Sequence, residues 1–223
     1  MTSMSLLLAR EILDATTHLP DGATLVIPQV GWDDYEHLLE ELAGRPHLRV
    51  SYDCGRLEIV SPSAKHEKYA EFIDDLVRAY ADSRNMELEK LGHTTWRREA
   101  LAKGAEADGC YYIGNPERIL GKDTIDLKSD PPPDIVLKID ITNDSSRKFT
   151  IFAALGVPEI WTYDGSTVRF YELTDRQYRL VLESRFLPGL TGKLLADAVK
   201  ISATRGQKTA LNVFRQSIRS RKK

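Results

Sequence analysis

The sequence has few of the features that would mark a secreted, metal-stapled or membrane-spanning protein. It contains only two cysteines, Cys54 and Cys110, which lie far apart and show no metal-ligand spacing. A structural zinc site is therefore not indicated, and a reducing compartment is the simplest setting. The apolar run at residues 6–9 is too short to span a bilayer, and no cleavage site follows a long apolar segment. We therefore expect a cytoplasmic protein without membrane contacts.

Net charge is also nearly absent, because the 223 residues sum to a formal charge of -2. The whole molecule thus gives no sign of a polyanionic partner. Residues 215–223 are nevertheless strongly basic, and such a tail either contacts phosphate without sequence preference or is a frayed solubilising end. A hydrophobic content of 42% suits one domain over residues 1–223. We expect a peripheral N-terminal layer over about residues 1–47 and a basic helical tail over about 204–223.

Periodicity and turn residues predict alternating helices and strands. Apolar residues recur every three or four positions over about residues 65–84, which predicts a long amphipathic helix. Asp53, Cys54 and Gly55 separate two short apolar segments, which is typical of a hairpin. Other helices are expected at about residues 5–15, 32–42, 191–199 and 208–218, and strands at about 23–27, 48–52, 56–60, 86–91, 94–98, 108–113, 159–164, 167–173 and 178–183.

Residues 131–142, with the sequence PPPDIVLKIDIT, are the most informative segment. Isoleucine and leucine at alternate positions form one strand face, while Lys138 and Asp140 share the other. Ser145 and Ser146 can cap a following helix that Gly156 ends, and residues 159–164 then predict a parallel crossover. Strands of such a unit are covered on both faces, which favours a functional site; a charged edge strand is the alternative.

Asp108, Asp140 and Lys148 can meet at one end of this sheet. Two carboxylates there suit Mg²⁺. A lysine beside them can orient an attacking water or stabilise charge on phosphorus. Because Lys148 lies in the first turn of its helix, where the macrodipole disfavours a cation, we expect Asp140 or Asp108 as its partner. Structural salt bridging is an equal alternative to metal-dependent chemistry.

His66 and Lys138 complete the set of candidates. A histidine on an apolar helix face is more often a hydrogen-bonded core residue than a ligand or base. The place of His66 in the first helical turn, just after a bend, favours the mouth of a cleft. Lys138 lies on a mostly covered strand face and needs a counter-ion, so we expect its ammonium to pair with Asp108 or Asp140.

Four segments resemble the Uma-two family of predicted restriction endonucleases, in the PD-(D/E)XK nuclease superfamily. They are GRLEIVSPSAKHE at 55–67, GAEADGCYYIGN at 104–115, DPPPDIVLKIDIT at 130–142 and KFTIFAALGVPEIW at 148–161. The resemblance runs over about residues 32–190. It implies an α/β fold with a restriction-endonuclease-like core, in which helices flank a mixed sheet, and Mg²⁺ or Mn²⁺ at the site. It also implies that Asp108 and Asp140 bind the metal and that Lys148 is the catalytic lysine, displaced onto a helix.

Lys138 departs from this family pattern, because members generally carry the catalytic glutamate at its position. A cation in place of an anionic ligand should repel a divalent ion. Three accounts remain open: a natural pseudo-enzyme, an engineered inactive variant, and a rearranged site in which Asp140 replaces the lost ligand. Asp140 lies about 7 Å further along the strand. We therefore favour impaired metal binding.

The sequence thus predicts a divalent-metal-dependent DNA endonuclease with Asp108, Lys138, Asp140, Lys148 and His66 at its site. Asp108 and Asp140 would hold the metal, Lys148 would orient the water, and His66 would help at the cleft mouth. The alternative, which Lys138 favours, is a catalytically inactive nucleic-acid-binding or regulatory module of the same fold. A homodimer with a vestigial site is a third interpretation.

Overall fold

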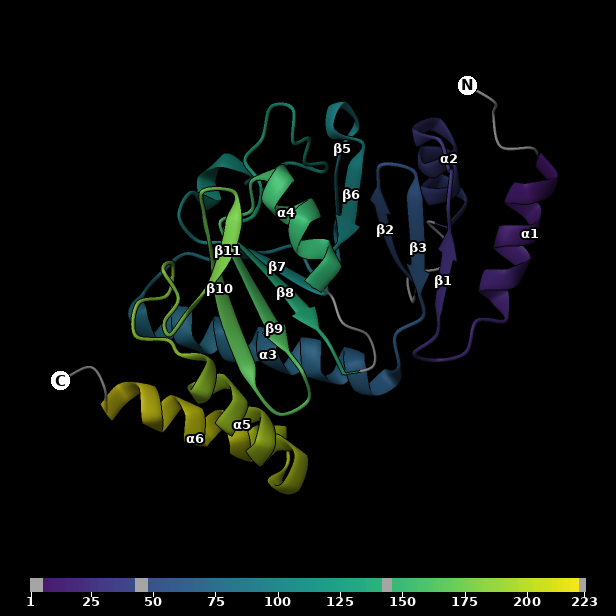
Figure 1. Cartoon of the computed structure of the whole chain (residues 1–223). Coiled ribbons are helices and arrows are strands. Elements are labelled where there is room, and N and C mark those ends of the chain that lie inside the picture. The colour runs from purple at the N-terminus through teal and green to yellow at the C-terminus, as the bar shows by residue number, and fades with distance from the viewer. Residues whose placement is uncertain (1–5, 43–47, 142–145, 221–223) are drawn as a thin grey trace.

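Two β-sheets lie side by side in the computed structural model, which describes residues 6–42, 48–141 and 146–220 (Figure 1). One sheet has the strand order β1 (Thr24–Ile27), β3 (Arg56–Val60), β2 (Arg49–Asp53), β6 (Lys103–Glu106) and β5 (Thr95–Arg98). The other has the order β11 (Gln177–Val181), β10 (Val168–Thr174), β9 (Glu159–Tyr163), β8 (Ile135–Ile139), β7 (Gly109–Tyr112) and β4 (Glu89–Lys90).

Helices cover both sheets, and the ends of the long α3 are explained by its capping residues. The long α3 (Ala64–Arg84) begins where the Ser63 side chain accepts a hydrogen bond from the His66 N–H, and it ends at Asn85 in the left-handed region. The other helices are α1 (Leu6–Thr17), α2 (Trp32–Leu42), α4 (Phe149–Leu155), α5 (Gly192–Arg205) and α6 (Gln207–Ser220), with 3₁₀ turns η1 (Glu99–Leu101), η2 (Pro116–Arg118) and η3 (Ser146–Lys148). Among these helices none is both long and apolar enough to cross a bilayer.

The strand β8 is central in its sheet, as the covered-strand interpretation predicted. It pairs in parallel with β9 and antiparallel with β7, and all five of its residues are buried. Leu137 packs in the core beneath α3, whereas Val136 packs on the opposite face with residues of α4. The edge-strand alternative is therefore wrong, and the predicted α/β class with a mixed sheet flanked by helices is confirmed.

The local turn predictions are also confirmed. Cys54 and Gly55 join β2 to β3 with φ angles of 47° and 95°, and Gly156 ends α4 with a φ of 82°. Glycine reaches positive φ easily, so the turn at Gly55 and the helix end at Gly156 could be predicted from the sequence. The hairpin matters for the site because it places Arg56 and Glu58 on β3 opposite β2, which in turn pairs with β6.

One expected strand is shorter in the structure, and one observed strand was not expected. The segment expected over 86–91 keeps only β4 (Glu89–Lys90), and residues 103–106 form the additional strand β6, which was not expected. Because β6 and β7 belong to different sheets, Asp108 lies in the link that crosses between them. Thr142, Ser145 and parts of the expected terminal segments (1–5, 43–47, 221–223) lie outside the described residues. The predictions of a single domain, a peripheral layer and a basic tail stay predictions.

Candidate active site

Asp108 occupies the short link between β6 and β7, and its side chain is fully buried at 0% exposure. Its Oδ2 accepts a hydrogen bond from the backbone N–H of Ile139 at 2.8 Å. Its own backbone N–H donates to the carbonyl of Leu137 at 3.0 Å. The carboxylate is thus held directly against β8 at the junction of the two sheets.

Three basic side chains surround this carboxylate. Lys138 Nζ lies 2.8 Å from Asp108 Oδ2, and the Lys138 side chain is only 5% exposed. His66 Nε2 lies 3.4 Å from the same oxygen, and Arg49 Nε lies 3.4 Å from Oδ1. Burial by itself would raise the pKa of Asp108, but Lys138 and His66 outweigh it and hold that pKa well below its usual range. The expected pairing of Lys138 with Asp108 is therefore confirmed.

Arg49 is a buried residue of this cluster with several polar contacts, and the sequence did not predict its role. Its side chain is 3% exposed, and its Nη2 lies 2.7 Å from Glu67 Oε1 and 2.9 Å from His93 Nδ1. Its Nη1 lies 3.6 Å from Glu106 Oε1. Burial raises the pKa of Glu106, and Arg49 acts against that rise. The only sequence signal for this residue is a charge inside the apolar segment that forms β2.

His66 joins the Asp108 cluster, but it does not lie at a cleft mouth. Its side chain is only 8% exposed, and its Nδ1 lies 3.4 Å from Glu67 Oε1. The cleft-mouth prediction is wrong because the first turn of α3 packs inward, where Arg49 also draws Glu67 into the cluster. Burial lowers the pKa of His66, but hydrogen bonding to Asp108 and Glu67 raises it above the ordinary value.

The raised pKa of His66 predicts a pH dependence of folding stability. A histidine whose pKa is higher when folded stabilises the protein below its unfolded pKa of about 6.5, and this contribution is lost as the pH rises through the folded value. We expect the free energy of unfolding to fall over this window in urea titrations, and His66→Gln to flatten the profile. Parallel profiles for the two proteins would contradict this assignment.

Lys148 lies nearby but has a different partner from the one expected. It ends η3, its side chain is 11% exposed, and its Nζ lies 3.3 Å from Glu58 Oε1. Glu58 also accepts a hydrogen bond from Arg56 Nη1 at 2.9 Å. Burial and the charge of Lys138 lower the pKa of Lys148, against the opposing effects of Glu58 and Asp108. The expected pairing with Asp140 or Asp108 is thus replaced by Glu58, which the hairpin brings to η3.

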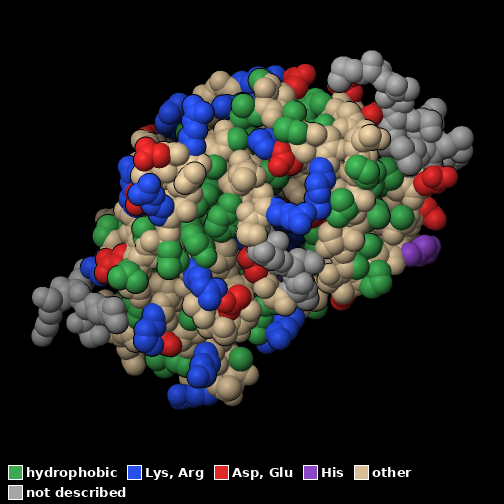
Figure 2. Space-filling model, viewed as in Figure 1, with side chains coloured by type: hydrophobic (Ala, Val, Ile, Leu, Met, Phe, Trp, Pro, Cys, Tyr) green, Lys and Arg blue, Asp and Glu red, His purple; other side chains and the backbone are tan. Residues whose placement is uncertain are grey.

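A cavity of about 250 Å³ opens beside Lys148. Figure 2 shows basic side chains around a hollow in this region of the surface, between α4 and the β2–β3 hairpin. The lining combines three cations with two carboxylates and small polar or aliphatic side chains: Arg56, Arg147, Lys148, Asp53, Glu58, Ser51, Thr150 and Ile151. This cavity lies next to the buried cluster, because the charges of Lys138 and Asp108 both act on the pKa of Lys148, which lines it.

Asp140 directly follows β8 and is partly buried. Its backbone N–H donates to the carbonyl of Tyr163 at 2.7 Å, which fixes the end of the strand. Its expected role as a metal ligand stays a prediction.

The described residues do not form a ready site for a divalent metal. In residues 6–42, 48–141 and 146–220, no three or more His, Cys, Asp or Glu side chains are grouped so that they could hold a metal ion. Lys138 Nζ already lies 2.8 Å from Asp108 Oδ2, and Arg49 and His66 face the same carboxylate. The negative charge of Asp108 is therefore neutralised by side chains of the protein, and the arrangement of these residues does not fit Mg²⁺.

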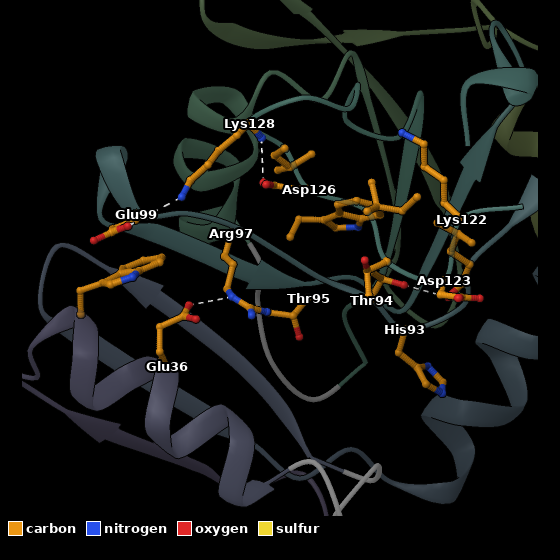
Figure 3. A pocket seen from close by; sticks show the side chains of 16 residues that line it. Glu36, His93, Thr94, Thr95, Arg97, Glu99, Lys122, Asp123, Asp126 and Lys128 are labelled. Carbon is orange, nitrogen blue, oxygen red and sulfur yellow. Dashed lines mark hydrogen bonds and ion pairs between the residues drawn. The ribbon is translucent and has the colours of Figure 1, made fainter. Parts of the chain in front are cut away.

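A larger pocket, of about 630 Å³, lies between the start of α2, β5 and the loop at residues 122–128 (Figure 3). Arg97 pairs across it with Glu36 at 2.7 Å, and Lys128 lies 3.9 Å from Glu99. Asp108, Lys138 and Lys148 do not line this pocket. Among its lining residues His93 contacts Arg49, and size by itself does not make this pocket the candidate active site.

The chain is similar to one known family and to a solved structure. Residues 32–203 match the family model Uma2, described as "Putative restriction endonuclease". A crystal structure described as that of "a putative nuclease belonging to DUF820" from Anabaena variabilis ATCC 29413 is similar over 66% of this chain and 89% of that chain, with 16% sequence identity and a TM-score of 0.47. No curated protein matches the chain.

Proposed function

This chain belongs to the Uma2 family, and we propose that it is a DNA-binding protein of the nuclease fold whose metal-dependent cleavage is suppressed by Lys138. Membership of a family of restriction endonucleases implies a nucleic acid as the substrate class. The observation that carries the proposal is the contact of 2.8 Å between Lys138 Nζ and Asp108 Oδ2, with both side chains at most 5% exposed. Lys138 acts there as a tethered replacement for a metal cation.

The electrostatic cost of adding a divalent ion to this cluster supports the proposal. Two unit charges 4 Å apart interact by about 4 kcal/mol at an effective dielectric constant of about 20, and a divalent ion doubles that figure. Lys138 and Arg49 would each repel such an ion, while Asp108 alone is the fully buried carboxylate of the cluster. Glu67 and Glu106 already pair with Arg49, and Asp108 already pairs with Lys138, so we infer that the unmodified chain binds Mg²⁺ and Mn²⁺ weakly.

DNA binding does not need that metal. Arg56, Arg147 and Lys148 line the cavity beside the cluster, and arginine presents a planar fork of donors that fits phosphate oxygens. Glu58 lies 2.9 Å from Arg56 and 3.3 Å from Lys148, so it positions both cations in the lining. A phosphodiester at this cavity would meet three cations and two carboxylates beside the buried cluster, which supports binding without cleavage.

We expect the unmodified chain to bind duplex DNA equally well in chelator and in Mg²⁺, and to leave supercoiled plasmid intact. Binding should weaken as salt is added, because phosphate contacts release counterions. Fluorescence anisotropy and a plasmid-nicking assay measure the two properties. Mg²⁺-dependent nicking by the unmodified chain that disappears in Asp140→Ala would contradict the proposal and support the rearranged site instead.

A further inference from the structure

The formal charge of -2 conceals a strong separation of charge along the chain. Residues 191–223 contain nine lysine and arginine residues against the single acid Asp197, whereas residues 1–190 contain 22 basic and 32 acidic residues. Residues 191–220 include the helices α5 and α6, which pack against each other and against α3 (Figure 1). Figure 2 shows lysine and arginine side chains over these two helices at the lower edge of the view. The helical pair is thus a cationic surface on an otherwise acidic molecule.

The basic residues of α6 lie in one line. Lys208, Arg215 and Arg219 are all exposed, and they are spaced by seven and four residues. At 100° per residue these positions fall within about 40° of one another, and at 1.5 Å per residue they span roughly 16 Å. Asn212 and Gln216 are exposed beside this stripe, and α6 contains no acidic residue. The exposed face of α6 therefore offers only cations and neutral hydrogen-bonding groups.

The opposite face of α6 is already used. Ala210, Phe214 and Ile218 are at most 2% exposed and pack into the core that α3 shares. Lipid surfaces are bound by amphipathic helices whose apolar face is free to insert, and α6 has no such face to offer. The charge pattern consequently fits a hydrophilic polyanion.

The basic stripe has no internal counter-ions. Lys193 on α5 pairs with Asp197 at 2.7 Å. For Lys208, Arg215 and Arg219, no ion pair occurs within the part of the chain that the structure describes. Aligned and unpaired cations repel one another. A ligand with regularly spaced negative charges would relieve this repulsion and would therefore bind the stripe favourably.

We propose that the exposed face of α6, through Lys208, Arg215 and Arg219, binds the phosphate backbone of duplex DNA. B-DNA presents one negative charge per about 1.7 Å of axis and a major groove about 12 Å wide, so phosphates bordering a groove lie within the roughly 16 Å span of the stripe. The inference rests on the proposed DNA binding and names a surface for it. The family match ends at residue 203, before α6 begins, so this surface is an addition to the matched region.

The test compares the unmodified chain with Lys208→Gln/Arg215→Gln/Arg219→Gln in anisotropy titrations of a labelled duplex. We expect affinity at about 50 mM salt to fall roughly tenfold or more, and the slope of log K against log salt to decrease by about one for each cation that no longer neutralises a phosphate. The matched control is Arg176→Gln/Arg179→Gln/Arg185→Gln, which removes the same charge from exposed positions on and after the β10–β11 hairpin. Its slope should stay close to that of the unmodified chain.

Circular dichroism melting should show that all three proteins are equally folded, since the substituted side chains are exposed. Equal decreases in affinity for the α6 variant and its control would overturn the inference while leaving DNA binding intact. Absence of duplex binding by the unmodified chain would overturn both the inference and the proposed binding function. Binding to phosphatidylserine vesicles in place of DNA, abolished in the α6 variant, would replace the proposed partner by a lipid surface.

Discussion

Replacing Lys138 by glutamate should make this chain nick supercoiled DNA in Mg²⁺ or Mn²⁺, with a rate at least on the order of 10²-fold above that of the unmodified chain. The change removes the cation 2.8 Å from Asp108 Oδ2 and puts an anionic ligand beside the one fully buried carboxylate of the cluster. Two adjacent carboxylates attract a divalent ion strongly where an ammonium and a carboxylate do not. Plasmid nicking followed over time by gel electrophoresis measures the gain.

Matched variants separate the new ligand from the removed cation. Lys138→Gln removes the charge without adding a ligand, and it should not recover nicking. Adding Asp108→Ala or Lys148→Ala to Lys138→Glu should abolish cleavage again, because the first removes a ligand and the second removes a cation near the reacting phosphate.

A second readout is independent of cleavage. Lys138→Glu places two buried carboxylates side by side, so it should melt at a lower temperature than the unmodified chain in chelator and regain stability when Mn²⁺ is added. The unmodified chain should show no such metal-dependent rise. Equal metal-induced shifts in the two proteins would mean that Lys138 does not obstruct the metal and would remove the basis of the proposed function.

Asp108→Asn should destabilise the folded chain by about 3–5 kcal/mol, because it leaves the buried Lys138 ammonium without its carboxylate partner. Lys138 is only 5% exposed, so it cannot recover its hydration without opening the junction of the sheets. At about 2–4 °C per kcal/mol for a chain of this size, the melting temperature should fall by roughly 6–20 °C. Calorimetry or urea unfolding measures the change.

Two variants test the cause of this destabilisation. Asp197→Asn breaks the exposed pair with Lys193 and should cost less than about 1 kcal/mol, which separates the buried from the exposed case. Asp108→Asn/Lys138→Met should be more stable than Asp108→Asn alone, because the second change removes a stranded charge. A double variant no more stable than the single one would show that Lys138 is not the buried charge that Asp108 neutralises.

Local patterns in the sequence determined most of the secondary structure. The alternation along residues 135–139, the positive-φ turn at Gly55 and the stop at Gly156 depend on neighbours within a few positions, so each could be predicted from a short window. The resemblance to a nuclease family rested on segments in the same order along the chain. The presence of Asp108, Lys138 and His66 in one cluster could therefore be anticipated.

Pairing between distant segments decided the rest of the site. Arg49 contacts Asp108 across 59 residues of sequence, and Lys148 contacts Glu58 across 90. These contacts depend on β6 joining the first sheet and β7 joining the second, a choice that no short window encodes because its energy comes from long-range burial. The sequence alone determined which charges are present and that Lys138 stands where an acid is expected. The tertiary structure decided that Asp108, and not Asp140, is the partner of this lysine and that His66 is enclosed in the cluster and does not lie at a cleft mouth, because burial of a charge requires partners from several elements at once.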